Sequence, residues 1–219
     1  MAENETLDFE DCAIGESSFS NLTSSMKGGY VEVVSDPIEG GGHGNVLKFV
    51  AETTGVGDSI STTVGGSSVN PSCFEASFDF CMGEYKASNA VVFRMTLSNS
   101  FRIMMKYSNG KLTLGDDSNT GTRTDYGVSL ELGRWYNIRM EYYFNVEGGA
   151  VAKVYVDDKL VAVSDNYLGK TADGSSAPGS TTKTFQIYSY YPVLHTTYFD
   201  NISANRTDRV YVAETPAVE

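Results

Sequence analysis

The chain has 219 residues, of which 41% are hydrophobic and 20% charged, which is enough apolar sequence for a sizeable core in one domain. Its formal net charge of −12 argues against binding to nucleic acid or to an anionic membrane surface, because both would repel it. No run approaches the roughly 18 apolar residues that predict a membrane-spanning helix. The many Tyr, Gly, Ser and Thr residues are typical of an extracellular all-β domain. We therefore expect a secreted or surface-attached protein whose signal peptide is no longer present, with a cytosolic origin as the alternative.

The three cysteines, Cys12, Cys73 and Cys81, do not suggest a disulfide framework. Cys73 and Cys81 lie about 26 Å apart on one predicted strand and cannot bridge each other. A bridge between Cys12 and Cys73 stays open, but we expect buried free thiols. No paired Cys and His spacing predicts a zinc site.

The first half of the chain reads as short strands separated by polar turns. Residues 1–6 are a polar lead, and residues 17–29 form a polar loop. Period-2 alternation and bounding Gly or Pro residues predict strands at Leu7–Asp11, Tyr30–Val34, Asn45–Ala51, Ser59–Val64 and Phe74–Met82. A hairpin is predicted from Val91–Leu97 and Phe101–Tyr107, and Asn109-Gly110 predicts a type I′ turn into Lys111–Leu114. Residues 115–124 read as another polar loop.

The segment Leu132–Val163 carries the clearest strand pattern. Its first strand alternates an apolar face with a polar face. The apolar face holds Tyr136, Ile138, Met140, Tyr142 and Phe144, and the other holds Asn137, Arg139, Glu141 and Tyr143. Turns are predicted at Gly148-Gly149 and at Asp157-Asp158.

The closing strands are predicted at Thr184–Tyr190 and Thr196–Ala204, after a Gly- and Ser-rich loop over residues 166–182. Residues 208–219 read as a linker toward further domains of a larger chain. About a dozen strands at a spacing of roughly 8–12 residues, without helical periodicity, predict one sandwich domain over residues 7–207.

The residues Gly133-Arg-Trp-Tyr-Asn-Ile-Arg-Met-Glu-Tyr142, followed by Val154-Tyr-Val-Asp-Asp-Lys-Leu-Val161, resemble the central hairpins of laminin-G/concanavalin A-like jelly rolls. The resemblance extends from Leu7 to about Arg206. It implies an all-β, jelly-roll β-sandwich of two antiparallel sheets, similar to non-catalytic carbohydrate-binding modules. It also implies that Trp135 packs in the core.

Glucanases of this resembled fold carry their catalytic carboxylates on one strand, and the nearest equivalents here are Glu75 and Asp79. Four strand residues separate them by about 13 Å, which exceeds the carboxylate spacing of retaining and inverting glycosidases. His43 and His195 lack the accompanying Arg or Gln motifs of lyases. We therefore predict that the chain is not an enzyme; a glycoside hydrolase or polysaccharide lyase with an atypical site is the alternative.

The acidic segments near the two ends resemble paired segments that hold a structural Ca²⁺ in many carbohydrate-binding jelly rolls. Calcium takes six to eight oxygen ligands, which suits carboxylates on adjacent strands. Glu10 and Asp200 are the first candidates and Asp8 the third; the alternative is a solvated acidic strand end.

A candidate binding face follows from the last strands. Gln186, Tyr188 and Tyr190 alternate with the apolar Phe185 and Ile187. Three cations point away from the apolar positions of their own strands in the same way: Arg94, Arg102 and Lys106. Tyrosine rings stack on sugars, whereas Gln and Arg side chains hydrogen-bond hydroxyls. The alternative is a cross-strand tyrosine ladder that only stabilises the sheet.

These patterns predict a monomeric, non-catalytic module that binds a neutral plant polysaccharide, either starch or another α-glucan, or a β-glucan or xylan. The acidic net charge favours a neutral ligand over an anionic one. Such a module would belong to a bacterial glycan-degrading or adhesion system. A surface protein-interaction module is the third possibility.

Overall fold

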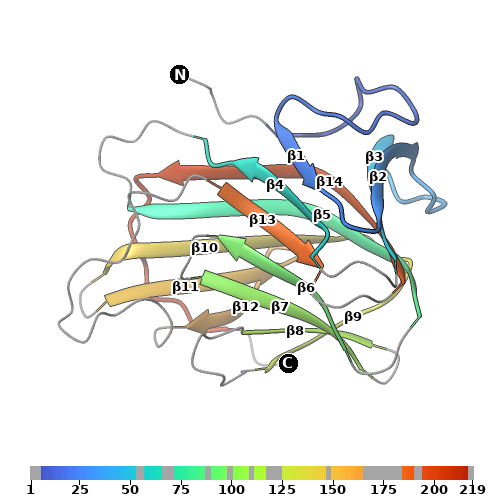
Figure 1. Ribbon diagram of the computed structural model, residues 1–219. Helices are drawn as coiled ribbons and strands as arrows, with labels where there is room; N and C mark the ends of the chain where they lie inside the picture. The colour runs from blue at the N-terminus through green and yellow to red at the C-terminus, as the bar shows by residue number, and fades with distance from the viewer. Residues whose placement is uncertain are drawn as a thin grey trace.

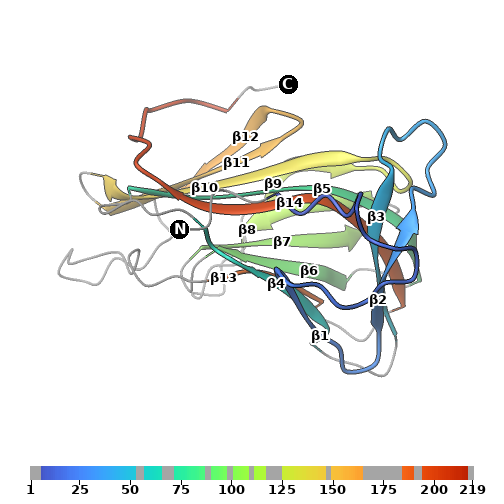
Figure 2. The same cartoon turned by 90° about the horizontal axis from the view of Figure 1, so that it is seen from above.

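The computed structural model describes residues 6–52, 57–65, 72–86, 90–97, 101–108, 111–116, 125–146, 149–164, 184–189 and 194–216. These residues form two antiparallel sheets of seven strands each, packed face to face (Figures 1 and 2). This confirms the predicted concanavalin A-like jelly-roll sandwich.

The sheet nearer the viewer in Figure 1 is called the front sheet. Its strands, in spatial order, are β1 (Leu22–Ser25), β4 (Ser59–Thr63), β13 (Thr184–Ser189), β6 (Ala90–Leu97), β7 (Phe101–Ser108), β8 (Lys111–Asp116) and β9 (Asp125–Leu130).

The other sheet is called the back sheet. Its strands, in spatial order, are β12 (Lys159–Ser164), β11 (Gly149–Val156), β10 (Tyr136–Val146), β5 (Cys73–Tyr85), β14 (His195–Thr207), β3 (Asn45–Ala51) and β2 (Tyr30–Ser35).

The core between the sheets is rich in aromatic rings supplied by alternate residues of facing strands. Phe78 of β5 packs on Phe185 of β13, with ring centroids 5.7 Å apart. Phe80 meets Phe93 edge to face at 6.3 Å. Phe199 of β14 contacts several of these rings and is fully buried. Edge-to-face and offset ring pairs of this kind stabilise the fold beyond the burial of their apolar area. These aromatic residues therefore stabilise the core of the sandwich.

Two strands lie where the sequence predicts polar loops or makes no prediction. β1 contains a single apolar residue, Leu22, whose side chain is buried. β9 alternates Tyr126, Val128 and Leu130 toward the core, but Gly127 and two polar residues interrupt the pattern. Conversely, the strand predicted at Leu7–Asp11 is reduced to a single bridge between Leu7 and Ile202. Short edge strands are recruited by pairing with a neighbour, which a local pattern does not contain.

Trp135 does not lie in the core, as the family resemblance implied. Because Tyr136 points inward, strand alternation directs Trp135 to the outer side of the back sheet. Its indole Nε1 donates a hydrogen bond to Asp36 Oδ1 at 3.1 Å, and its ring packs against His43 with centroids 4.0 Å apart. Trp135 therefore holds the 36–44 loop against the sheet.

All three cysteines are free thiols. Cys73 and Cys81 are buried on β5, and burial raises the pKa of each thiol to about 12. They remain protonated at neutral pH, which makes them unreactive structural residues.

Residues 208–216 pass over the outer face of the back sheet (Figure 2), and this segment is called the C-terminal strap. Lys153 Nζ of β11 donates to the Val212 carbonyl oxygen at 2.7 Å and to Glu214 Oε1 at 2.5 Å. Arg209 pairs with Glu141 of β10 at 2.5 Å. Lys153 and Glu141 are each only 1% exposed. The strap therefore buries these two charged side chains and supplies each with a partner of opposite charge. That residues beyond 208 lead to a further domain stays a prediction.

Candidate functional site

The outer face of the front sheet collects the predicted binding residues. Tyr188 of β13 lies directly opposite Arg94 of β6, and Gln186 opposite Thr96. Thr96 in turn lies opposite Arg102 of β7. Directly opposite residues on one face have Cβ atoms about 4.5–5.5 Å apart, so these side chains form a continuous surface.

Lys106 continues this surface along β7, two residues beyond Met104 and opposite Thr113 of β8. The register therefore brings together five of the six predicted residues, although it does not test their role in binding. Tyr190 lies outside the described residues. The side chains of Gln186, Tyr188, Arg94 and Arg102 are half-buried, whereas Lys106 is exposed.

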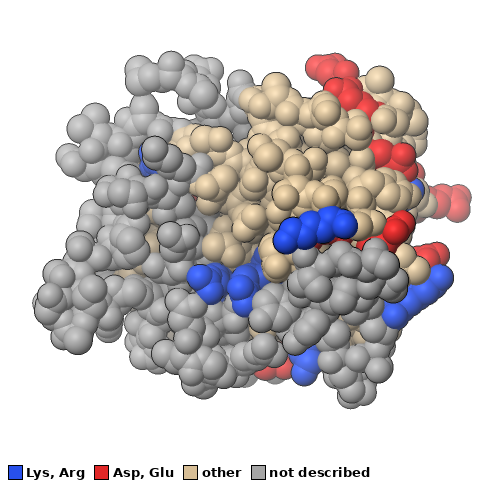
Figure 3. Space-filling model, viewed as in Figure 1, with Lys and Arg blue, Asp and Glu red and all other residues tan. Residues whose placement is uncertain are grey.

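The described charged side chains on this face are mostly cationic, although the chain has a net charge of −12. Figure 3 shows Lys and Arg side chains near the middle of the face and Asp and Glu mostly along its right-hand side. Among the outward side chains that are described on the front-sheet strands, the one carboxylate is Asp125, on the edge strand β9. Arg94, Arg102 and Lys106 therefore form a locally positive surface suited to an anion.

A fourth cation reaches the same place from a loop. Lys27 Nζ and the Tyr188 hydroxyl lie 3.4 and 2.9 Å, respectively, from the point where a Cβ on Gly57 would stand. Gly57 has a φ of +100°, so only glycine fits there comfortably, both for its backbone and for the contact with the Tyr188 ring. Lys27 falls in the polar loop predicted over residues 17–29, and no local pattern in the sequence predicts this contact.

Asp58 positions the Lys27 loop. It is fully buried, and its Oδ1 accepts hydrogen bonds from the backbone N–H of Lys27 at 2.5 Å and of Gly28 at 3.3 Å. Its carbonyl oxygen accepts the N–H of Ser189 at 2.8 Å, immediately after Tyr188. One buried residue thus ties the lysine loop to the end of the tyrosine strand, which preorganises both groups.

His195 is a core residue. Its Nε2 lies 3.3 Å from Ser189 Oγ and its Nδ1 lies 3.2 Å from Thr197 Oγ1. Burial lowers the pKa of His195 to about 3, so the ring is neutral. The pair Ser189 and His195 has the residue types of a hydrolase nucleophile and base, but both are buried between the sheets with no access for a polysaccharide. They link the two sheets through a polar contact.

His43 lies at the opposite side of the sandwich. Its Nδ1 contacts Asp200 Oδ2 at 2.7 Å on the back sheet. Burial raises the pKa of Asp200, and the hydrogen bond from His43 opposes this rise. Asn201 then bonds Asp79 Oδ2 at 2.7 Å, which gives that carboxylate a structural role. Glu75, the other carboxylate compared with glucanases, pairs with Arg209 of the strap at 2.9 Å.

The calcium candidates do not converge on one point. The two carboxylate oxygens of Glu10 accept the N–H groups of Gly44 at 3.0 Å and Asn45 at 3.3 Å, and Asp8 accepts the N–H of Glu10 at 3.4 Å. Asp200 is engaged with His43 and Asn201. Across the described ranges no three His, Cys, Asp or Glu side chains form a group that would hold a metal ion. These side chains therefore do not fit a calcium cage as arranged, and calcium binding stays a prediction.

No protein-family model and no curated protein sequence matches the chain. Its fold matches many solved structures. One is "Cellulose induced protein, Cip1", with a TM-score of 0.63 and 14% identity over 93% of this chain and 99% of that one. Another is alginate lyase Aly36B, with a TM-score of 0.60 and 12% identity over 93% of this chain and 98% of that one. A third is endo-β-1,4-glucuronan lyase from the fungus Trichoderma reesei, with a TM-score of 0.53 and 11% identity over 93% and 95%.

At such identities the likeness shows the fold alone. Two of these three structures are named as polysaccharide-cleaving enzymes. The prediction that the chain is not an enzyme is therefore corrected. It relied on the wide spacing of Glu75 and Asp79 and on the absence of lyase motifs around His43 and His195, and local motifs of this kind do not detect a site assembled from distant strands. In the described residues no helix is long and apolar enough to cross a membrane.

Proposed function

We propose that the chain is a polysaccharide lyase that cleaves a uronate-containing polymer on the outer face of the front sheet. The observation that carries this proposal is the juxtaposition of Tyr188 with Arg94 across the strand pair and with Lys27 above Gly57. The Tyr188 hydroxyl, which can transfer a proton, has Arg94 on one side and Lys27 on the other, and these two cations suit the carboxylate of a uronate sugar. The local charge favours an acidic polymer in place of the neutral glycan expected from the net charge.

The chemistry of β-elimination needs few groups. A base removes the proton on C5, next to the uronate carboxylate, and negative charge develops on that carboxylate. The electron pair forms the C4=C5 double bond, the glycosidic C4–O bond breaks, and the departing oxygen takes up a proton. Arg94 and Lys27 stabilise the developing charge, as preorganised donors do in other active sites. The Tyr188 hydroxyl donates its proton to the departing oxygen and recovers one from solvent, which accepts the C5 proton.

The remaining residues of the face bind the neighbouring sugars. The Gln186 amide, held by a contact of its Nε2 with Ser59 Oγ at 3.3 Å, can donate to a ring hydroxyl. Arg102 and Lys106 lie on the next strand and suit a second carboxylate. A polysaccharide substrate is encountered outside the cell. We therefore retain the proposal that the protein is secreted or surface-attached.

The test is a panel of polyglucuronate, alginate and polygalacturonate beside starch, xylan and β-glucan. We expect ultraviolet absorbance from the new double bond with at least one acidic polymer, and none with the neutral polymers. Tyr188→Phe is expected to lower the rate by roughly 100-fold or more. Tyr30→Phe, on the exposed edge of the back sheet, is the matched control and keeps full activity. Reducing ends released without absorbance would indicate hydrolysis and contradict the proposal, as would no cleavage of any polymer.

A further inference from the structure

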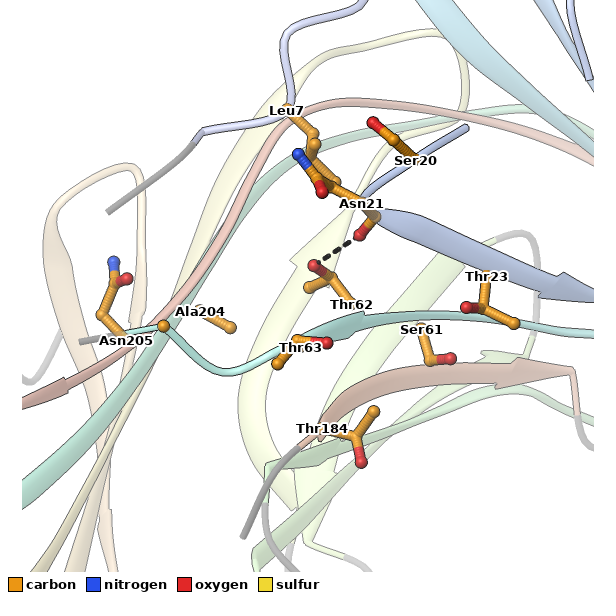
Figure 4. A pocket seen from close by; sticks show the side chains of 11 residues that line it. Leu7, Ser20, Asn21, Thr23, Ser61, Thr62, Thr63, Thr184, Ala204 and Asn205 are labelled. Atoms are coloured by element: carbon orange, nitrogen blue, oxygen red, sulfur yellow. Dashed lines mark hydrogen bonds between the residues drawn. The ribbon is translucent and has the colours of Figure 1, made fainter. Parts of the chain in front are cut away.

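A small pocket lies at the corner of the sandwich where β1 and β13 begin and β4 ends, next to Ala204 and Asn205 of β14 (Figure 4). It has a volume of about 170 Å³. A single water needs only about 10–15 Å³ of such space, so the pocket has room for a group much larger than one water. The pocket is lined by Leu7, Ser20, Asn21, Thr23, Ser61, Thr62, Thr63, Gly65, Thr184, Ala204 and Asn205.

The described residues of the lining are rich in hydroxyl groups, and none of them carries a charged side chain. The Thr62 hydroxyl is committed to the fold, because it donates to the Asn21 carbonyl oxygen at 2.9 Å, the bond drawn dashed in Figure 4. On the other side, Gly65 joins β14 through its N–H, which donates to the Ala204 carbonyl oxygen at 2.7 Å. The pocket is therefore built on hydrogen-bonded backbone with a polar, uncharged surface.

The register makes this pocket continuous with the proposed active site. Thr184 lies opposite Thr63, and Gln186 lies opposite Ser61, which in turn lies opposite Thr23 of β1. These residues share the outer face with Tyr188, because residues 184, 186 and 188 alternate with the buried Phe185 and Ile187. Four strand residues place Thr184 about 13 Å from Tyr188.

We infer that this corner pocket is a subsite for an uncharged sugar of the same polymer, so that the substrate alternates acidic with neutral units. The inference rests on the proposed function and specifies its substrate class. At the centre of the face, Arg94 and Lys27 match a carboxylate. At the corner pocket, the Ser and Thr hydroxyls of the lining can hydrogen-bond the hydroxyls of an uncharged sugar. A carboxylate buried there would find no cation among the described lining residues.

The experiment compares polyglucuronate, a homopolymer of uronate, with deacylated gellan, in which glucuronate is flanked by neutral sugars. The wild-type protein is expected to have the higher kcat/KM on gellan. The double variant Thr63→Val/Thr184→Val keeps shape and β propensity but removes two hydroxyls. It is expected to raise KM on gellan about tenfold with kcat unchanged, and to leave polyglucuronate cleavage unaltered.

Thr196→Val on β14 of the back sheet is the matched control and is expected to change neither polymer's KM. Equal loss on both polymers, or no loss on gellan, would overturn the subsite while leaving the lyase proposal standing. If no polymer is cleaved, the lyase proposal fails, and affinity gels containing gellan then test the pocket directly. Retardation of the wild type that the double variant loses supports the subsite, and equal migration of the two proteins rejects it.

Discussion

The outer faces of the two sheets carry similar side chains, but their charges are satisfied in different ways. On the back sheet, Arg139 pairs with Glu141, and Lys153 pairs with Glu214 of the strap. On the front sheet, Arg94, Arg102 and Lys106 face outward with one described carboxylate, Asp125, at the edge of the sheet. Both faces read in the sequence as polar-aromatic strands.

The difference indicates which face is available to a ligand. On the back sheet, Lys153 lies over the rings of Tyr143 and Tyr211 at 5.6 and 5.2 Å, so the strap supplies both an anion and an aromatic partner. The C-terminal strap therefore covers this part of the back sheet and pairs with the charges of Lys153 and Glu141. The strap passes over the back sheet, and the described charged side chains on the outer face of the front sheet are mostly cations; this local charge supports a site for an external anion there.

Removal of the strap is expected to have the largest effect. A chain ending at Thr207 loses Arg209, Tyr211 and Glu214, and with them one of the cationic partners of Glu141 and the carboxylate partner of Lys153. We expect a stability loss of about 3–5 kcal/mol and a fall in Tm of roughly 10 °C. Differential scanning calorimetry measures both. Retention on acidic polymer gels below the new Tm should be unchanged, and lost retention would mean that the two faces are not independent.

The second effect concerns His195, which joins the sheets. Its folded pKa of about 3 lies below the ordinary value of about 6.5, so below pH 6.5 the unfolded chain binds a proton that the folded chain does not. Stability therefore falls as the pH falls toward 3, by about 2–3 kcal/mol at pH 4.5. His195→Gln removes this dependence, so urea unfolding at pH 7 and pH 4.5 should show a smaller difference for the variant. Equal pH dependence in both proteins contradicts the assignment.

A smaller effect is expected from single cations of the front face. Arg94→Ala should weaken retention on an acidic polymer about tenfold and reduce its salt dependence, because a charge-assisted hydrogen bond contributes about 1.5–3 kcal/mol. Lys48→Ala on the back sheet, where Lys48 pairs with Glu32 at 2.8 Å, is the control and should leave retention intact. An equal loss in the two variants would point to net charge instead of a site.

The smallest expected effect is that of chelation, which tests the calcium prediction at Asp8, Glu10 and Asp200. An ion that binds only the folded chain stabilises it, so EDTA lowers the Tm of a calcium-loaded protein and added Ca²⁺ restores it. Glu10→Gln removes one predicted ligand and should abolish that response. A melting curve that EDTA does not move contradicts calcium binding.

Much of the fold follows from local patterns. Alternation places Ile138, Met140 and Tyr142 inward, and the structure buries all three. The predicted Asp157-Asp158 turn appears with φ values of +48° and +60°, as a type I′ hairpin requires. The face shared by Gln186 and Tyr188 was also predictable, because two-residue periodicity is a property of one strand.

Local patterns do not decide which strands pair with each other. Tyr188 faces Arg94 because β13 inserts between β4 and β6, strands more than 80 residues earlier in the chain. Lys27 reaches Tyr188 because the buried Asp58 holds its loop, and the 36–44 loop packs on Trp135 at the outer side of the back sheet. Local patterns in the sequence were enough for most of the strands, their inward residues and the sandwich class, since these depend on neighbours two residues apart; β1 and β9 were missed. The tertiary structure alone decided the register, the docking of the strap and the assembly of the site, since those depend on contacts between distant segments.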